Sequence, residues 1–154
     1  MSKILGIDPG LRVTGYGVIH QDKQKFTYES SGTIKTTKQD LDLAARIKII
    51  VTGIDEVIEK FSPNIVAIEK VFVNTNPQST LLLGQARGAA IAAIVSKEIN
   101  IYEYTALQIK KSVVGNGHAD KLQVQTMVQR LLKLPSLPGS DSGDALACAI
   151  CHAN

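Results

Sequence analysis

The chain has 154 residues, of which 44% are hydrophobic and 20% are charged, and its formal net charge is +3. This length and composition are typical of one globular domain, so we expect residues 1–154 to share a single core. The sequence contains no apolar run of about 18 residues, which excludes a transmembrane helix. The apolar segment after Met1-Ser2-Lys3 is too short for a signal peptide, so the cytoplasm is the expected location.

Strands are predicted at the beginning of the chain. Residues 3–8 are apolar, residues 14–20 are rich in β-branched and aromatic side chains, and residues 25–34 alternate less regularly. Because the connections between them are short, these segments predict an antiparallel meander. A helix over about residues 39–61 follows, since apolar residues recur there at three- and four-residue steps. These residues are Leu43, Ile47, Ile50, Ile54, Val57 and Phe61.

The rest of the chain alternates between predicted strands and helices. Strands are expected at residues 64–69 and 99–104, with a helix over about residues 77–98 between them. Asn76 is the expected cap of that helix, and Pro77 suits its first turn. Three more helices are predicted at residues 105–112, at residues 120–132, and from Ser140, as a cap, to about residue 152. A meander followed by βα units predicts an α/β fold, with a five-stranded mixed sheet and helices on both faces.

The predicted helix over residues 77–98 is rich in small side chains. Small side chains allow two backbones to approach closely. Packing against the sheet and self-association explain this composition equally well, and the sequence leaves both open. Gly84, Gly88 and Ala92 are spaced four residues apart and form the ridge that self-association would use.

Four carboxylates stand where a folded interior would not normally hold a charge. Asp8 and Glu69 each end an apolar strand-like run. Asp141 and Asp144 open the apolar stretch 145–150 at a spacing that places both side chains on one helix face. If the first and fourth strands pair in parallel, Asp8 and Glu69 become neighbours, and the last helix can bring the other two acids over them.

Such a cluster predicts bound cations. An unpaired buried carboxylate is very costly, and oxygen ligands suit Mg²⁺ or Mn²⁺, which keep waters for a phosphate substrate. The four acids therefore predict a metal-dependent site that cleaves phosphodiesters, with two ions close together in each site. A turn-forming aspartate before Pro9-Gly10 is the alternative for Asp8, but that alternative leaves Glu69 unexplained.

The charges are unevenly distributed. Residues 70–133 carry a net charge of +5, whereas residues 1–69 are neutral overall. A basic middle beside an acidic pocket fits a protein that holds a polyanion over metal ions, although a solvated lysine-rich surface has the same composition.

Cys148 and Cys151 form a lone C-x₂-C pattern. A zinc site would need two more ligands at matching spacing. The sequence has no second pair, so we interpret the two cysteines as buried thiols in a reducing compartment.

The order of the elements, with acids on the first strand, the fourth strand and the last helix, resembles the ribonuclease-H-like nuclease superfamily. More narrowly, the chain is similar to the RuvC family of Holliday-junction resolvases over essentially its whole length. Five stretches carry this similarity in the same order: GIDPGLRVTGYGVI (6–19), AIEKVF (67–72), LGQARG (83–88), KSVVG (111–115) and DALA (144–147).

The resemblance implies a homodimeric DNA endonuclease that resolves four-way (Holliday) junctions during recombination and repair by nicking two opposing strands symmetrically. The family's four acidic metal ligands fall on Asp8, Glu69, Asp141 and Asp144, and some members carry histidine at the position of Asp141. The expected cofactor is Mg²⁺, at two ions per site, with Mn²⁺ as a substitute. The family usually works with the RuvA–RuvB motor. Relatives often extend past the final helix with a basic tail, whereas this chain stops at Asn154.

The resemblance also implies DNA contacts. Phe72 occupies the position of an aromatic side chain that stacks near unpaired junction bases. Lys110 and Lys121 occupy the positions of family lysines that lie near the scissile phosphate. Core packing is the alternative for Phe72, and a solvated first-turn lysine is the alternative for Lys121. Arg12 and Arg87 are expected to reach phosphate or, equally, to pair with a surface acid.

Two other classes of function share some of these features. A sugar kinase or actin-like ATPase also begins with a strand that ends in Asp-x-Gly, but it needs a second domain that 154 residues cannot supply. A non-catalytic junction-binding module would use the same basic surface without needing four convergent acids.

Overall fold

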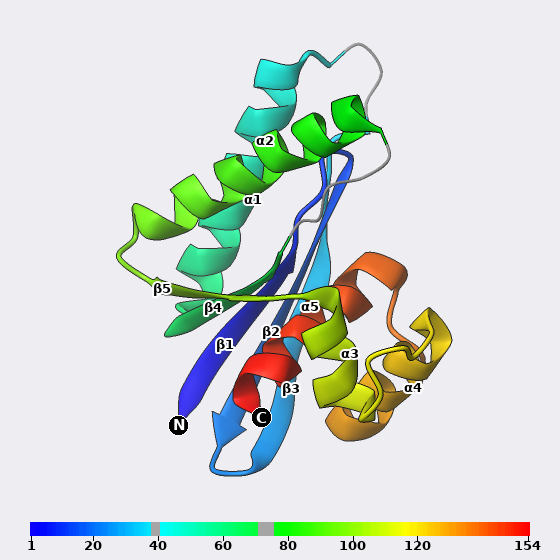
Figure 1. Cartoon of the computed structure of the whole chain (residues 1–154). Coiled ribbons are helices and arrows are strands. Elements are labelled where there is room, and N and C mark those ends of the chain that lie inside the picture. The colour runs from blue at the N-terminus through cyan, green and yellow to red at the C-terminus, as the bar shows by residue number, and fades with distance from the viewer. Residues whose placement is uncertain (38–40, 71–75) are drawn as a thin grey trace.

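The computed structural model describes residues 1–37, 41–70 and 76–154 (Figure 1). Its elements follow in the order β1 (Ser2–Asp8), β2 (Val13–Asp22), β3 (Lys25–Lys35), α1 (Leu43–Phe61), β4 (Ile65–Glu69), α2 (Pro77–Val95), β5 (Asn100–Tyr104), α3 (Ala106–Val114), α4 (Lys121–Leu132) and α5 (Ser140–Ala153). None of the helices in the described ranges is long and apolar enough to cross a membrane.

Among the described residues, five strands form a sheet in the spatial order β3-β2-β1-β4-β5. β1 pairs antiparallel with β2, and β2 pairs antiparallel with β3, as expected for a meander. β1 pairs parallel with β4, and β4 pairs parallel with β5. Because parallel neighbours need a long crossover, α2 connects β4 to β5. The predicted mixed sheet is therefore confirmed.

Helices cover both faces of this sheet, which confirms the predicted layers (Figure 1). Side chains alternate along β1, so Leu5 and Ile7 pack with α1 and α2, whereas Ile4 packs on the opposite face with α3, α4 and α5. From Gly143 to Cys151, α5 is buried at every residue except Asp144, as expected for a helix enclosed by the sheet and two other helices.

Glycines in β1 and β2 let α5 lie very close to the sheet. A Cβ atom added at Gly6 would lie 1.9 Å from the backbone oxygen of Ala145, and one added at Gly15 would lie 2.1 Å from the backbone oxygen of Asp141. Any other residue at either position would push the helix away, since real Cβ atoms do not approach a backbone oxygen so closely. The first turn of α5 is therefore held against the end of β1.

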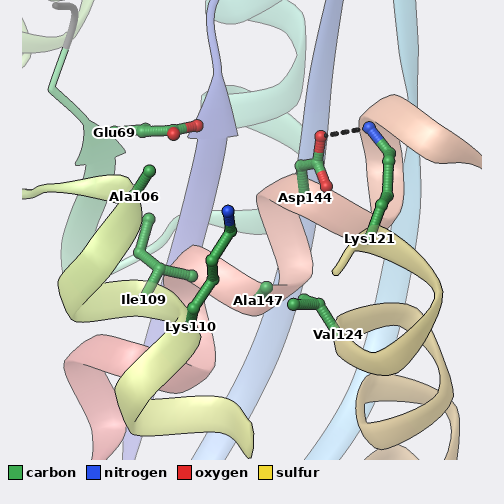
Figure 2. Close-up of a pocket in the computed structure, with 8 residues that line it drawn as sticks. All are labelled: Glu69, Ala106, Ile109, Lys110, Lys121, Val124, Asp144 and Ala147. Atoms are coloured by element: carbon green, nitrogen blue, oxygen red, sulfur yellow. Dashed lines mark hydrogen bonds and ion pairs between the residues drawn. The ribbon is translucent and has the colours of Figure 1, made fainter. Parts of the chain in front are cut away.

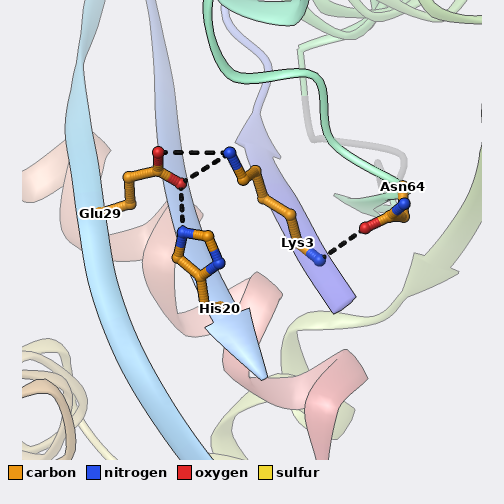
Figure 3. Close-up of polar contacts among 4 residues, drawn as sticks. All are labelled: Lys3, His20, Glu29 and Asn64. Atoms are coloured by element: carbon orange, nitrogen blue, oxygen red, sulfur yellow. Dashed lines mark hydrogen bonds and ion pairs between the residues drawn. The ribbon is translucent and has the colours of Figure 1, made fainter. Parts of the chain in front are cut away.

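The opposite end of β1 carries a polar cluster (Figure 3). A β-bulge leaves Glu29 without a register partner in β2, and its carboxylate lies 2.6 Å from Nε2 of His20 and 3.3 Å from Nζ of Lys3. The backbone nitrogen of Lys3 also donates to Oδ1 of Asn64 at 2.8 Å, just before β4. These half-exposed contacts join three strands and add little stability individually.

Several predicted boundaries are wrong. α1 begins at Leu43, because the side chain of Asp42 caps it by accepting from the backbone nitrogen of Ala45; residues 38–40 lie outside the described ranges. Ser140 is the first residue of α5, and Gly139 is the cap, without a side-chain hydrogen bond. α2 ends at Val95 rather than at residue 98, whereas its predicted cap, Asn76, is confirmed.

Candidate active site

Asp8 and Glu69 lie side by side at one edge of the sheet. Asp8 is the last residue of β1, Glu69 is the last residue of β4, and the parallel register pairs Ile7 with Ile68. Gly6 faces α5, so the two-residue period of a strand turns Asp8 toward the same helix. The sequence-based prediction that the two acids become neighbours is confirmed.

The first turn of α5 brings Asp141 and Asp144 to the same place. Gly15 is the register partner of Asp8 and contacts the backbone of Asp141, so the helix begins directly over the end of β1. The Asp8 carboxyl interacts electrostatically with all three other acids. Four carboxylates from three distant segments of the chain therefore form one cluster.

The surroundings disfavour negative charge on the two strand-end acids. Burial, followed by the charges of Asp144, Glu69 and Asp141, raises the pKa of Asp8 from its ordinary value of 3.8 to about 8. Burial and the charge of Asp144 also raise the pKa of Glu69, although Lys110 and Lys121 oppose that shift. A cation placed between these carboxylates would remove the repulsion and displace the Asp8 proton.

A pocket of about 240 Å³ opens beside the cluster (Figure 2). Glu69 and Asp144 lie on its two sides, and the Lys110 ammonium points into the space between them. Lys121 donates from Nζ to Oδ2 of Asp144 at 2.9 Å. Burial lowers the pKa of Lys121, but this hydrogen bond and the nearby carboxylates outweigh burial and raise that pKa overall.

The pocket walls include residues that sequence reasoning missed. They are Ala106, Ile109, Val124 and Ala147. No sequence signal could have identified them, because apolar residues on amphipathic helices are indistinguishable from ordinary core residues. In the folded chain they form an apolar wall next to charged groups, which lowers the local dielectric constant and strengthens electrostatic interactions there.

The residues fit a divalent cation by their chemistry. Carboxylate oxygens are the ligands that Mg²⁺ and Mn²⁺ prefer, and burial and three neighbouring acids raise the pKa of Asp8, so a cation beside this carboxyl would favour its charged form. Within the described residues, no three His, Cys, Asp or Glu side chains are already arranged around one point as ligands. One oxygen of Asp144, Oδ2, accepts the hydrogen bond from Lys121.

The remaining predicted site residues are more scattered. Phe72 lies outside the described residues. Arg12 is exposed in the turn between β1 and β2, a few residues beyond Asp8. Arg87 forms an ion pair with Glu103 and donates from Nε to the backbone oxygen of Glu69 at 3.3 Å. The sequence had left two possible partners for Arg87, a DNA phosphate or a surface acid, and in this structure Arg87 pairs with an acid.

The two cysteines are buried free thiols on α5, as predicted. Burial, and secondarily the neighbouring Cys151, raises the pKa of Cys148 well above its usual range. Both thiols are therefore packing residues.

This fold and this acidic site together define the class of ribonuclease-H-like nucleases. The family model described as "Crossover junction endodeoxyribonuclease RuvC" matches residues 4–152. The chain belongs to the RuvC family. This membership rules out a sugar kinase or actin-like ATPase.

Curated relatives agree with the family match. The crossover junction endodeoxyribonuclease RuvC of Methylobacillus flagellatus is 64% identical, and the match covers 99% of this chain and 87% of the relative. The RuvC of Janthinobacterium sp. (strain Marseille) is 63% identical, over 99% of this chain and 83% of the relative.

Solved structures agree as well. Thermus thermophilus RuvC in complex with a Holliday junction substrate superposes with a TM-score of 0.92 at 32% identity, covering 99% of this chain and 93% of the other. The yeast mitochondrial Holliday junction resolvase shares the fold, with a TM-score of 0.70 at 14% identity over 99% of this chain and 79% of the other.

Proposed function

We propose that this chain resolves four-way DNA junctions by cutting two opposing strands symmetrically in a Mg²⁺-dependent reaction. One observation carries the proposal: the carboxyls of Asp8 and Glu69, at the ends of β1 and β4, meet those of Asp141 and Asp144 near the start of α5. The chain's membership in a family of crossover junction endodeoxyribonucleases supports the same conclusion.

The four acids would hold two Mg²⁺ ions, with Mn²⁺ as a substitute. Bound ions of this kind activate the attacking water and stabilise the leaving 3′ oxygen. Asp8 would be the central ligand in this proposal, because its carboxyl interacts with all three others, and it would have to be ionised to hold an ion. The Lys121 ammonium, which donates to Asp144, has further N–H groups that could donate to a phosphate oxygen in the transition state.

The proposed DNA surface surrounds this pocket. Lys110 and Lys121 line the pocket and are the proposed contacts to the scissile phosphate, and Arg12, which is exposed just after β1, is a further proposed contact. We propose that Phe72 stacks on a junction base, a contact worth about 1–3 kcal/mol. A phosphate contact by Arg87 would require this side chain to leave Glu103.

We further propose that the chain acts as a homodimer through α2. The small residues of this helix are divided between two faces: Ala86, Ala90 and Ala93 are buried, whereas Gly84 and Gly88 are exposed. Among the described residues, nothing lies within 4 Å of a Cβ atom added at either glycine. Because glycine inside a helix costs about 0.5–1 kcal/mol relative to alanine, a close partner helix is a physical reason for both.

Neighbouring apolar side chains extend the same face of α2. Leu81 is 63% exposed and Val95 is 54% exposed, on either side of the ridge formed by Gly84, Gly88 and Ala92. A two-fold dimer that pairs this face would present two identical sites, as two symmetric cuts require. The RuvA–RuvB complex is the proposed further partner, and the cytoplasm, where chromosomal DNA lies in bacteria, is the proposed location.

A cleavage assay on a synthetic four-way junction tests the proposal. With Mg²⁺, we expect paired nicks at symmetric positions, and no cutting of a linear duplex of the same sequence. EDTA should abolish the nicks while junction binding persists. Binding without cleavage in Mg²⁺ or Mn²⁺ would instead establish a non-catalytic junction-binding module.

A further inference from the structure

Arg87 links three elements behind the candidate active site. Its side chain extends from α2, pairs with Glu103 of β5, and donates from Nε to the backbone oxygen of Glu69 at the end of β4. The Arg87 side chain is only 17% exposed. A side chain with this burial and these two partners has little capacity left for a DNA phosphate.

The carbonyl that Arg87 holds belongs to a proposed metal ligand. β4 ends at Glu69, and the next backbone nitrogen, that of Lys70, donates to the backbone oxygen of Tyr104 at 2.8 Å. β5 and Arg87 therefore hold both sides of the peptide that joins Glu69 to Lys70. The direction of the Glu69 side chain depends on this backbone, because its Cα–Cβ bond is fixed by the peptides on either side.

We propose that Arg87 is a positioning residue for Glu69 rather than a phosphate contact. The guanidinium can serve both partners because it offers several N–H donors in one rigid plane. Removing it leaves the Glu69 carbonyl without this donor and the Glu103 carboxylate without its cation. The inference rests on the proposed function, since it assigns a role within the same cleavage site.

Three variants separate positioning from phosphate binding. Arg87→Met keeps most of the side-chain stem and removes every donor. Arg87→Lys keeps the charge that faces Glu103 but lacks the planar fork. Glu103→Gln weakens the hold on Arg87 without touching Arg87 itself. Arg130→Met, on an exposed position of α4, is the matched control for the loss of one positive charge.

Cleavage under single-turnover conditions is measured at saturating junction, and junction binding is measured in EDTA over a series of salt concentrations. We expect Arg87→Met to lower the cleavage rate by roughly 10–100-fold, the usual effect of losing a group that orients a ligand. Its junction affinity and salt dependence should match those of Arg130→Met. Arg87→Lys should recover only part of the rate, and Glu103→Gln should lower the rate without strengthening binding.

The opposite results would overturn the inference. A phosphate contact predicts that Arg87→Met weakens binding, reduces the salt slope by about one, and cleaves normally at saturation. It also predicts that Glu103→Gln strengthens binding by releasing the guanidinium. Thermal unfolding identifies any variant that fails to fold; if Arg87→Met does, the folded variant Glu103→Gln decides. If the wild type cuts no junction, the proposed function itself fails, whereas equal cutting by wild type and Arg87→Met defeats only this inference.

Discussion

The two helical layers of this molecule use small residues in opposite ways. On the α5 face, glycines of β1 and β2 are crowded, and an added Cβ at Gly15 would lie 2.1 Å from the backbone oxygen of Asp141. On the α2 face, Gly84 and Gly88 meet nothing within 4 Å among the described residues. In one layer, glycine is therefore needed for a close contact within the chain. In the other layer, the described residues make no such contact with the glycines.

The two layers therefore contribute to different parts of the proposed function. The crowded layer fixes backbone positions, and it carries the four acids. The open layer leaves a face that a second copy can cover, and it carries the proposed dimer contact. Substitutions in the first layer should change chemistry, whereas substitutions on the exposed face of the second should change association.

Loss of an acid in the crowded layer should have the largest effect. Asp8→Asn and Glu69→Gln are nearly isosteric, so we expect cleavage of a four-way junction to fall below detection while the fold and junction binding persist. Gel-based cleavage and binding assays on the same preparations measure both. Near wild-type nicking by both variants would show that these acids do not form the cleaving site.

Gly15→Ala tests the crowding directly. Its methyl group would collide with the backbone of Asp141, so we expect a loss of about 1–3 kcal/mol in stability and a slower cleavage step. Gly32→Ala is the matched control in the neighbouring strand, because its nearest neighbours are side-chain atoms of Tyr16. Denaturant unfolding and single-turnover cleavage should separate the two variants; equal behaviour would remove the argument from close approach.

Gly88→Leu tests the open layer. The leucine meets no other described residue near its Cβ, so the monomer should fold normally. Because the proposed partner helix could no longer approach, we expect a monomer that cuts one strand at a time. Light scattering gives the mass of the particle, and a wild-type chain that stays monomeric at micromolar concentration, with and without junction DNA, would contradict the dimer.

A further expected effect is a pH dependence of stability in the metal-free protein. The folded-state pKa of Asp8, about 8, lies above its ordinary value of 3.8, so the folded chain holds a proton that the unfolded chain has released. Stability should therefore fall as the pH rises between these two values and level off above the higher one.

Thermal unfolding in EDTA across this pH range measures the effect. Asp8→Asn should flatten the curve and be the more stable protein at the alkaline end. Mg²⁺ should raise the wild-type Tm there, because an ion that binds only the folded state stabilises it, and should raise that of the variant much less. Parallel curves for the two proteins would mean that Asp8 is not the perturbed group.

The sequence predicted the sheet and the meeting of the acids well. Asp8 and Glu69 each follow an apolar strand pattern, and the parallel pairing of β1 with β4 brings them together as expected. Strands of this kind are predicted reliably because their apolar residues are the ones that the fold buries. The cap of α5 was predicted wrongly, since capping depends on local backbone angles: Gly139, not Ser140, has the extended conformation before the helix.

Contacts between distant residues could not be predicted from single residues. A glycine within a strand signals close approach of another backbone, but only the fold identifies that backbone as the first turn of α5. For Arg87, the sequence allowed either a phosphate or an acidic side chain as the partner. The pairing of β4 with β5 places Glu103 close enough to form the ion pair. The apolar pocket walls, such as Ile109 and Val124, carry no signal that distinguishes them from core residues.

Cleavage of a supercoiled plasmid that extrudes a cruciform tests the central claim most directly, because one measurement reports chemistry and pairing together. With Mg²⁺, the wild-type chain should produce linear plasmid, since both strands are cut within one bound complex. Gly88→Leu should produce mainly nicked circles, and Asp8→Asn should leave the plasmid supercoiled. Linear product from Asp8→Asn, or from the wild type in EDTA, would contradict the account.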